Sequence, residues 1–156
     1  MKKVLNKDLN VTDYALEISN REIVETNLSF IESTDENNVP VITIELNGRD
    51  YDEYDAGISF DIYLSLDDLV DYPNTPTNIT DKIIDGHSYV MRPTEEEYSE
   101  LFIYLQKNTL EDMKNDLTTL WVAKVDDDNY MFKFSVPLEG VFTYFKINLK
   151  EFETQE

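Results

Sequence analysis

The stretch RDYDEYDAGISFDIYLSLDDLVD, residues 49–71, contains the clearest strand pattern of the chain and its densest acid. From Ile58 to Leu66, apolar residues alternate strictly with serine, aspartate or tyrosine, which is the period of a strand with one buried face. We expect this strand to bury one face and to turn the other toward water or a partner. The residues predicted on the buried face are Ile58, Phe60, Ile62, Leu64 and Leu66.

Eight carboxylates and three tyrosines share this stretch with a single base, Arg49. Tyrosine is enriched in protein interfaces, and opposed charges speed the encounter of two proteins. The stretch therefore supplies the candidate partner-binding residues. They are Asp50, Tyr51, Asp52, Glu53, Tyr54, Asp55, Asp61, Tyr63, Asp67, Asp68 and Asp71.

The acid is unevenly distributed along the chain. The formal charge is -20 over 156 residues, and residues 22–81 contribute fifteen acids against one base. A basic lead, residues 1–13, precedes this region, and seven bases lie after residue 82. The electrostatic potential around the protein is therefore expected to be asymmetric, with one part of the surface strongly negative.

Length and composition indicate one globular domain, residues 1–156, with a hydrophobic content of 41%. The chain has no cysteine, which suits a reducing compartment and excludes disulfides and thiolate metal sites. The lysines near the start are not followed by an apolar run, and no later window approaches 18 apolar residues. We expect a cytoplasmic protein of a host cell that does not bind membranes.

Several other segments also alternate as strands. The predicted strands cover residues 14–18, 24–30, 41–46, 120–125, 130–136 and 141–149. Asn47-Gly48 predicts a tight hairpin turn, because both residues tolerate positive φ. Residues 32–40 read as a loop, and residues 72–80, with two prolines, read as a surface connector.

The segment after Pro93 predicts helix. Thr94 and Glu97 match a capping box, and Tyr98, Leu101, Phe102 and Leu105 repeat at helical spacing. A second, shorter helix is predicted from Thr109 to Leu117. Ser65 is predicted to cap one further turn through Val70. The expected fold class is α+β: a mostly antiparallel sheet with a two-helix insertion at about 94–117, a mobile basic lead at 1–13 and a frayed acidic tail at 151–156.

No catalytic, metal or cofactor motif is recognisable. His87 is the only histidine and follows a glycine in a predicted turn, so it is interpreted as a surface residue. The acids at 50–55, 67–68 and 126–128 fit no established calcium loop. The four glycines match no phosphate-binding loop, and the charge of -20 disfavours direct contact with nucleic acid. We predict no enzyme activity, no cofactor and no bound metal.

The acid remains the main functional signal. It leads to the hypothesis of a non-enzymatic protein that masks a basic, nucleic-acid-binding surface of a partner such as a nuclease, as phage anti-CRISPR proteins and bacterial immunity proteins do. That comparison rests on size and charge, not on a motif. The alternative is a small structural or assembly protein, for example a phage virion component, whose acidity serves only solubility. A carboxylate-bound metal enzyme is the least favoured reading, and the oligomeric state is left open.

Overall fold

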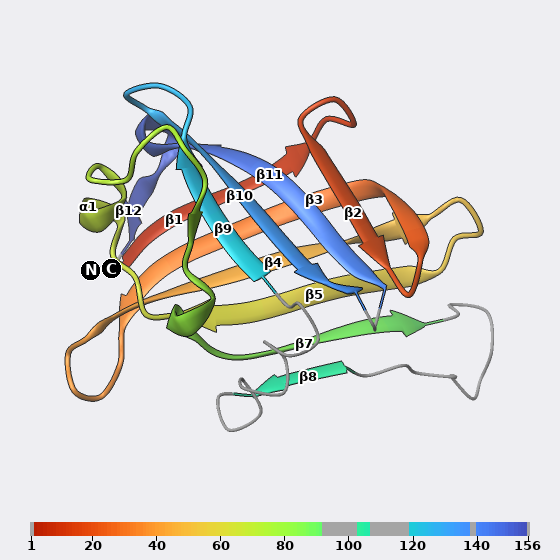
Figure 1. The fold of residues 1–156 in the computed structure, drawn as a ribbon. Coiled ribbons are helices and arrows are strands. Elements are labelled where there is room, and N and C mark those ends of the chain that lie inside the picture. The colour runs from red at the N-terminus through yellow and green to blue at the C-terminus, as the bar shows by residue number, and fades with distance from the viewer. Residues whose placement is uncertain (1, 92–102, 107–118, 138–139, 156) are drawn as a thin grey trace.

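The computed structural model describes residues 2–91, 103–106, 119–137 and 140–155, which form one antiparallel sheet curled into a half-barrel (Figure 1). Its strands are β1 (Lys2–Leu9), β2 (Tyr14–Ile18), β3 (Arg21–Thr34), β4 (Pro40–Asp50), β5 (Asp55–Ile62), β6 (Thr77–Asn78), β7 (Ile83–Met91), β8 (Ile103–Gln106), β9 (Thr119–Lys124), β10 (Asn129–Val136), β11 (Val141–Asn148) and β12 (Glu153–Gln155). The helical elements within the described residues are short: α1 (Leu66–Leu69) and the 3-10 turns Thr80–Lys82 and Leu149–Glu151.

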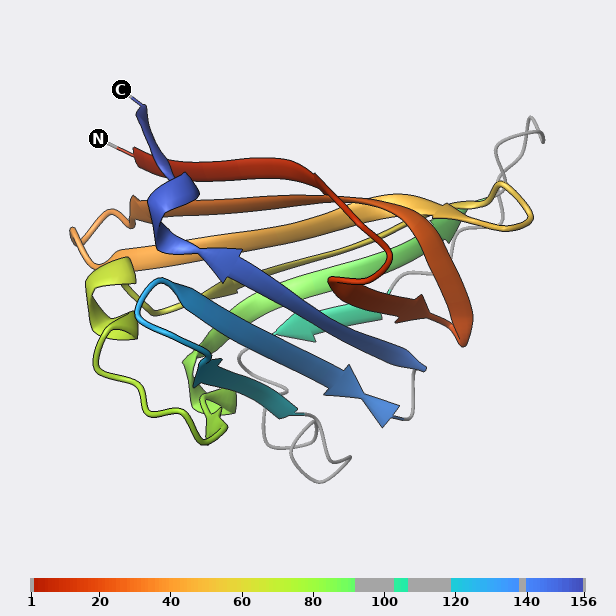
Figure 2. The same cartoon turned by 90° about the horizontal axis from the view of Figure 1, so that it is seen from above.

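The strand order is β6-β9-β10-β11-β2-β3-β4-β5-β7-β8, with β1 lying beside β3 and β12 beside β1. We call β1, β3, β4, β5, β7, β8 and β12 the β4 half, and β2, β6, β9, β10 and β11 the β10 half. β3 joins the two halves. Its first residues, Arg21 and Glu22, pair with β2, and its remainder pairs with β1 and β4. The sheet turns its corner at this strand (Figure 2).

The core lies between the inner faces of the two halves. Phe60 of β5 stacks on Phe134 of β10 with ring centroids 4.9 Å apart, and Phe30 of β3 meets Phe132 of β10 edge-on at 5.6 Å. These rings are at most 1% exposed. Side chains alternate across a strand, so the apolar rows that the sequence shows on β2, β3, β4, β5, β10 and β11 all face this core.

Alternation predicted most of these strands correctly. The segments at 130–136 and 141–149 form the paired β10 and β11, with Tyr130 opposite Ile147. The predicted strand at 58–66 is β5 as far as Ile62, and the predicted cap is also confirmed, since Ser65 accepts a hydrogen bond from the backbone N–H of Asp68 at the start of α1.

The predicted α+β class is wrong, because the structure is mostly antiparallel strand with very little helix. Residues 103–106, which the first predicted helix included, form β8 and pair with β7, with Ile103 opposite Ser88. The rest of that helix and the whole of the second lie outside the described residues. Pairing with β7 gives the backbone of these residues hydrogen bonds that a local helical pattern does not predict, so that pattern was not decisive.

The predicted turn at Asn47-Gly48 is also wrong. β4 runs through both residues, and the hairpin turns at residues 51–54. Gly48 meets a different requirement: a Cβ there would lie 1.7 Å from the backbone oxygen of Glu25. The register between β3 and β4 shifts between Ile23 and Glu25, and this bulge brings the two backbones together at Gly48.

The two ends of the chain lie side by side (Figure 1). The basic lead forms β1, and the acidic tail forms β12, with Lys2 opposite Gln155. The connector at 72–80 contributes the two-residue β6, which pairs with β9. Within the described part of the chain, no helix has the length and apolar character needed to cross a membrane.

Candidate functional site

The candidate residues at 50–55 form one end of the molecule, in the turn between β4 and β5 (Figure 1). Asp50 is only 6% exposed and organises this turn. Its Oδ1 accepts hydrogen bonds from the N–H groups of Asp52 and Tyr54, and its Oδ2 lies 2.7 Å from Nη1 of Arg21. Burial raises the pKa of Asp50, but the bonds from Tyr54, Arg21 and Asp52 outweigh burial and lower it below the usual value.

Arg21 fixes the same turn from β3. Its guanidinium lies 4.1 Å from the ring centroid of Tyr54, so that tyrosine is part of the packing. Tyr51 is 75% exposed, the Asp52 side chain is 76% exposed, and Glu53 is exposed with a φ of 65°. This end therefore presents Tyr51, Asp52 and Glu53 to solvent, whereas Asp50 and Tyr54 hold the turn together.

The acids at 67–71 lie at the opposite end of the molecule. Asp67 and Asp68 are in α1 and Asp71 follows it, at the far end of the half-barrel from the β4–β5 turn in Figures 1 and 2. Tyr63 lies between β5 and α1 and is 36% exposed. The eleven candidate residues therefore do not converge on one surface. They divide between two ends, with Asp55 and Asp61 on the sheet between them.

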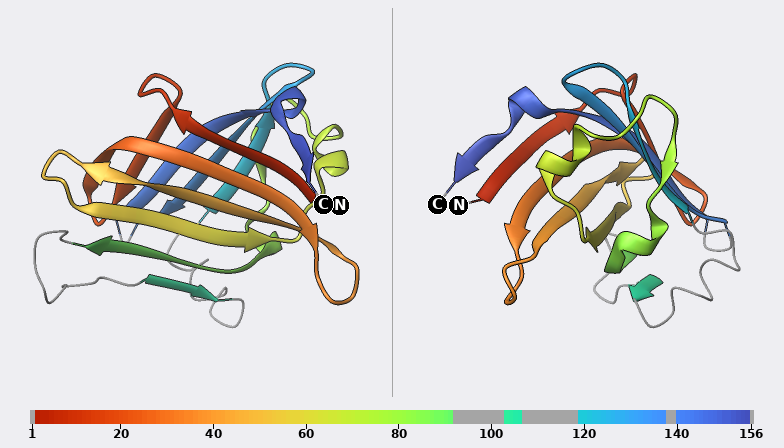
Figure 3. Two further views of the ribbon diagram at one scale, coloured as in Figure 1. Left: turned by 180° about the vertical axis from the view of Figure 1, so that it is seen from behind. Right: turned by 60° about the vertical axis from the view of Figure 1, so that its left-hand side comes forward.

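The outer face of the β4 half does gather acid, from strands that are distant in sequence. Strand pairing puts Asp8 opposite Asn27, Asn27 opposite Asn47, Asn47 opposite Gly57 and Gly57 opposite Tyr89. These five strands lie side by side (Figure 3), and most of their outward positions are polar. We call its carboxylates the acidic face: Asp8 of β1, Glu25 of β3, Glu45 of β4, Asp55 and Asp61 of β5, and Asp85 of β7.

Two acids of this face are directly opposed. Asp61 and Asp85 are register partners on β5 and β7, and Thr43 donates a hydrogen bond of 2.7 Å to Oδ1 of Asp61. Burial raises the pKa of Asp85, the charge of Asp61 and a hydrogen bond to it raise it further, and only His87 acts in the other direction. The face thus keeps two like charges side by side, an arrangement that costs stability.

The lysines that could neutralise the acidic face lie elsewhere. Lys133 and Lys146 occupy outward positions of the β10 half, and Lys150 lies 3.2 Å from Asp128. Among the described residues, Arg49 is the base that lies in the cross-strand rows of these six carboxylates, and its Nε is 3.1 Å from Asp55. Lys2 lies on the same side of β1 as Asp8, beyond the last of these rows. Six carboxylates against one guanidinium leave the face with a formal charge of about -5 at neutral pH.

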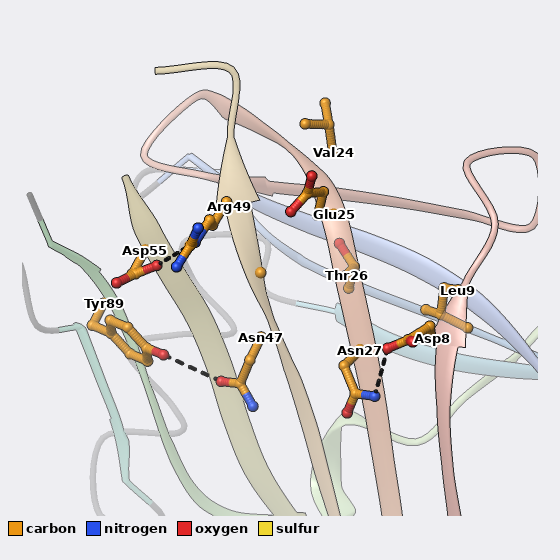
Figure 4. A pocket seen from close by; sticks show the side chains of 11 residues that line it. Asp8, Leu9, Val24, Glu25, Thr26, Asn27, Asn47, Arg49, Asp55 and Tyr89 are labelled. Atoms are coloured by element: carbon orange, nitrogen blue, oxygen red, sulfur yellow. Dashed lines mark hydrogen bonds and ion pairs between the residues drawn. The ribbon is translucent and has the colours of Figure 1, made fainter. Parts of the chain in front are cut away.

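A hollow of about 780 Å³ opens in the acidic face near the β4–β5 turn (Figure 4). Asn27 and Asn47 line it, and the ring of Tyr89 crosses Gly57 so that its hydroxyl lies 3.3 Å from Oδ1 of Asn47. A Cβ on Gly57 would lie 2.7 Å from that ring. Burial raises the pKa of Tyr89, and the charges of Asp55 and Glu45 add to the effect.

The described residues include no side-chain group arranged to hold a metal ion. His87 is exposed on β7, opposite Ser59. Asp126 forms a turn, accepting hydrogen bonds from the side chain of Asn129 and the N–H of Asp128, which lower its pKa. These positions are explained by local structure.

Four acids of the acidic face were not among the sequence candidates: Asp8, Glu25, Glu45 and Asp85. Alternation places Glu25 and Glu45 on the polar side of their strands, but it does not show which strands are neighbours. The pairing of β1 with β3, and of β7 with β5, is needed to bring all four together. No protein-family model, curated protein or solved structure gives a match to this chain.

Proposed function

We propose that the protein is a non-enzymatic binding protein whose acidic face docks on a basic surface of a protein partner. The observation that supports this best is the concentration of six carboxylates, with one ion-paired base among them, on one face of five neighbouring strands. Solubility alone does not require acids to be placed opposite one another, as Asp61 and Asp85 are.

The partner proposed is a protein that binds nucleic acid, such as a nuclease, because such proteins present the basic surfaces that an acidic face complements. By occupying that surface the protein would keep nucleic acid away from it. We place this interaction in the cytoplasm of a host cell, and no cofactor takes part in it. Opposed fields would speed association and make it sensitive to salt.

The test compares variants that change the net charge equally at different places. The tagged protein captures its partner from host lysate, the partner is identified, and its affinity for each purified variant is measured. Glu45→Lys with Asp85→Lys reverses charge on the acidic face, whereas Glu36→Lys with Asp71→Lys makes the same change at exposed sites in the β3–β4 loop and after α1.

We expect the acidic-face pair to abolish capture and the control pair to weaken it only slightly. Raising the salt from about 0.1 M to about 1 M shortens the Debye length from roughly 10 Å to roughly 3 Å and should release the partner. If both double variants lost the same affinity, net charge rather than the acidic face would explain binding. Full binding by the acidic-face variant would disprove the proposal. Self-assembly that ignores both salt and charge reversal would instead favour a structural protein.

A further inference from the structure

The outer face of the β10 half lacks the acid that marks the rest of the chain. The outward positions of β9, β10 and β11 contain no aspartate or glutamate, although the chain has 33 such residues. We call these positions the acid-free face: Thr119, Trp121, Ala123, Asn129, Met131, Lys133, Ser135, Phe142, Tyr144, Lys146 and Asn148. Acid resumes at its edge with Glu17 of β2, the register partner of Phe142.

Large apolar side chains and lysines lie side by side on this face. Strand register puts Trp121, Lys133 and Tyr144 in one row, and Ala123, Met131 and Lys146 in the next. Trp121 is 37% exposed, Lys133 is exposed, and Tyr144 and Lys146 are half-buried. Neither lysine forms an ion pair with a carboxylate of the described residues. The face therefore offers apolar surface and two cations to a binding partner.

The two rows are complementary to each other. Two sheets that pack face to face lie about 10 Å apart, with their strands within about 30° of each other. A two-fold axis that crosses the strands midway between the rows puts each row of one copy over the other row of a second copy. Trp121 then covers Ala123, Lys133 lies along Met131, and the ring of Tyr144 covers Lys146, as listed strand by strand.

These contacts match in size and in charge. The largest side chain of the face meets the smallest, and a tyrosine ring meets a lysine ammonium, a contact that strengthens as water is removed. Symmetry makes every contact twice. The charge of the chain, -20, argues against nucleic acid or an acidic protein as the occupant, because both are repelled at long range. A second copy is repelled as well, but across this face no carboxylate of an outward position meets another.

We infer that the acid-free face is the interface of a two-fold dimer of this chain, an inference that does not depend on the proposed function. The outer faces of the two halves point away from each other (Figure 2). A dimer formed through the β10 halves would therefore carry its two acidic faces on opposite sides. It would offer two docking surfaces to basic partners, so that a partner with two basic sites gains avidity.

The size of the face predicts a weak dimer. β10 and β11 are eight residues long, and the five strands from β6 to β2 span roughly 24 Å, so the face measures on the order of 600 Å². Two copies would bury about 1,200 Å² in total, which is the lower bound for specific interfaces. We therefore expect a dissociation constant on the order of micromolar.

The first test measures association of the full chain by sedimentation velocity and by the fluorescence of Trp121, the one tryptophan of the sequence. Dilution from roughly 100 μM to roughly 1 μM should dissociate the dimer and move the emission to longer wavelength. Added salt screens the repulsion between the two chains and should strengthen the dimer, whereas it should release the basic partner from the acidic face. A chain that stays monomeric at roughly 100 μM in about 0.5 M salt would overturn the inference.

The second test uses variants with matched controls. Lys146→Glu places a carboxylate against the negative ring face of Tyr144, and Lys2→Glu makes the same change in net charge at an exposed site of β1. Tyr144→Ala removes the ring, and Tyr51→Ala removes one at the exposed β4–β5 turn. We expect Lys146→Glu and Tyr144→Ala each to weaken the dimer about tenfold or more, and the controls to weaken it much less. Circular dichroism shows whether each variant is folded. Unchanged association in folded Lys146→Glu and Tyr144→Ala would contradict the proposed interface.

The third test locates the interface by cross-linking. The chain has no cysteine, so a single introduced cysteine is the one site that a thiol reagent can join. Met131→Cys would lie beside the two-fold axis, and a short bifunctional maleimide should link it to its symmetry mate; Ser59→Cys, on the outer face of β5, should not be linked. Linking of Ser59→Cys alone would move the interface to the β4 half and overturn the inference. A single-stranded oligonucleotide that quenches Trp121 in a monomeric chain would assign the face to nucleic acid instead.

Discussion

The outer faces of the two halves differ sharply, although both halves have the same apolar inner face. The β4 half turns asparagine, serine, aspartate and glutamate outward, whereas the β10 half exposes aromatic residues with lysines between them. Its outward positions include Trp121, Met131, Lys133, Phe142, Tyr144 and Lys146. Folding needs the inner rows, but it does not require one outer face to be acidic and the other aromatic. The proposed function uses this contrast, because it assigns docking to the acidic outer face.

The strongest test of the shared inner face is to remove the ring contact that joins the halves. Phe60→Ala and Phe134→Ala should each cost about 3–5 kcal/mol of unfolding free energy, because each leaves a cavity in the core. The double variant should cost less than the sum, since the two rings stack on each other. Urea unfolding measures all three. Tyr144→Ala, on the outer face of β11, is the control and should cost much less; equal losses would mean that the outer faces also contribute to the core.

The next largest effect is expected at the bulge that shapes the β4 half. Gly48→Ala introduces a Cβ 1.7 Å from the Glu25 carbonyl, so the two strands must separate locally. We expect a loss of about 1–3 kcal/mol, the usual range for overpacking. Asn47→Ala, one residue earlier and exposed, should change stability much less in the same thermal or urea unfolding experiment. A Gly48→Ala protein as stable as wild type would show that the close approach is not required.

A smaller, pH-dependent effect is expected at Asp50. Its folded pKa is lowered, so it contributes stability that is present above its unfolded pKa and is lost as the pH falls through the folded pKa. Asp50→Asn should cost about 1–3 kcal/mol at neutral pH, through its buried contacts with Arg21 and the turn. The difference from wild type should begin to shrink below about pH 4, the ordinary pKa of an aspartate in the unfolded chain, and should be lost as the pH falls through the lower folded pKa. A difference that is constant with pH would exclude the charge as its cause.

The smallest effect should have the opposite sign. Asp85 has a raised folded pKa, so its ionisation costs stability, and this cost should disappear as the pH falls through that pKa. Asp85→Asn should add a few tenths of a kcal/mol at neutral pH by removing the repulsion from Asp61, and the gain should vanish in acid. Asp71→Asn, after α1, is the matched control. A loss of stability at neutral pH in Asp85→Asn would show that this carboxylate makes a favourable contact instead.

Local patterns in the sequence identified the strands whose inner faces are apolar, including β5, β10 and β11, and the cap at Ser65. They failed where a distant strand decides the outcome. Asn47 and Gly48 are residue types typical of a turn, but both lie within β4, and Gly48 allows the close approach of β3 at its bulge. The β1 strand combines lysines with leucines, and only its neighbours β3 and β12 show that it belongs to the sheet.

The acids of the fold do not gather where their density along the chain suggested. Acid density along the chain selected residues 50–55 and 67–71, which the fold puts at opposite ends. The acidic face depends on strand register, and register between strands that are far apart in sequence cannot be obtained from alternation within each strand. Asp55 and Asp61 are the two residues that belong to both the predicted set and the face.

The pairing of β2 with β11 has a consequence for how the chain folds during synthesis. Tyr14 pairs with Phe145, so the early strand β2 cannot find this neighbour until β11 has left the ribosome. The β4 half consists largely of successive hairpins and can form first, while β2 waits with an open edge. Sheets closed by such distant pairings fold slowly and expose aggregation-prone edges meanwhile. We therefore expect chains truncated before β11 to be the least soluble forms of this protein, despite their acid.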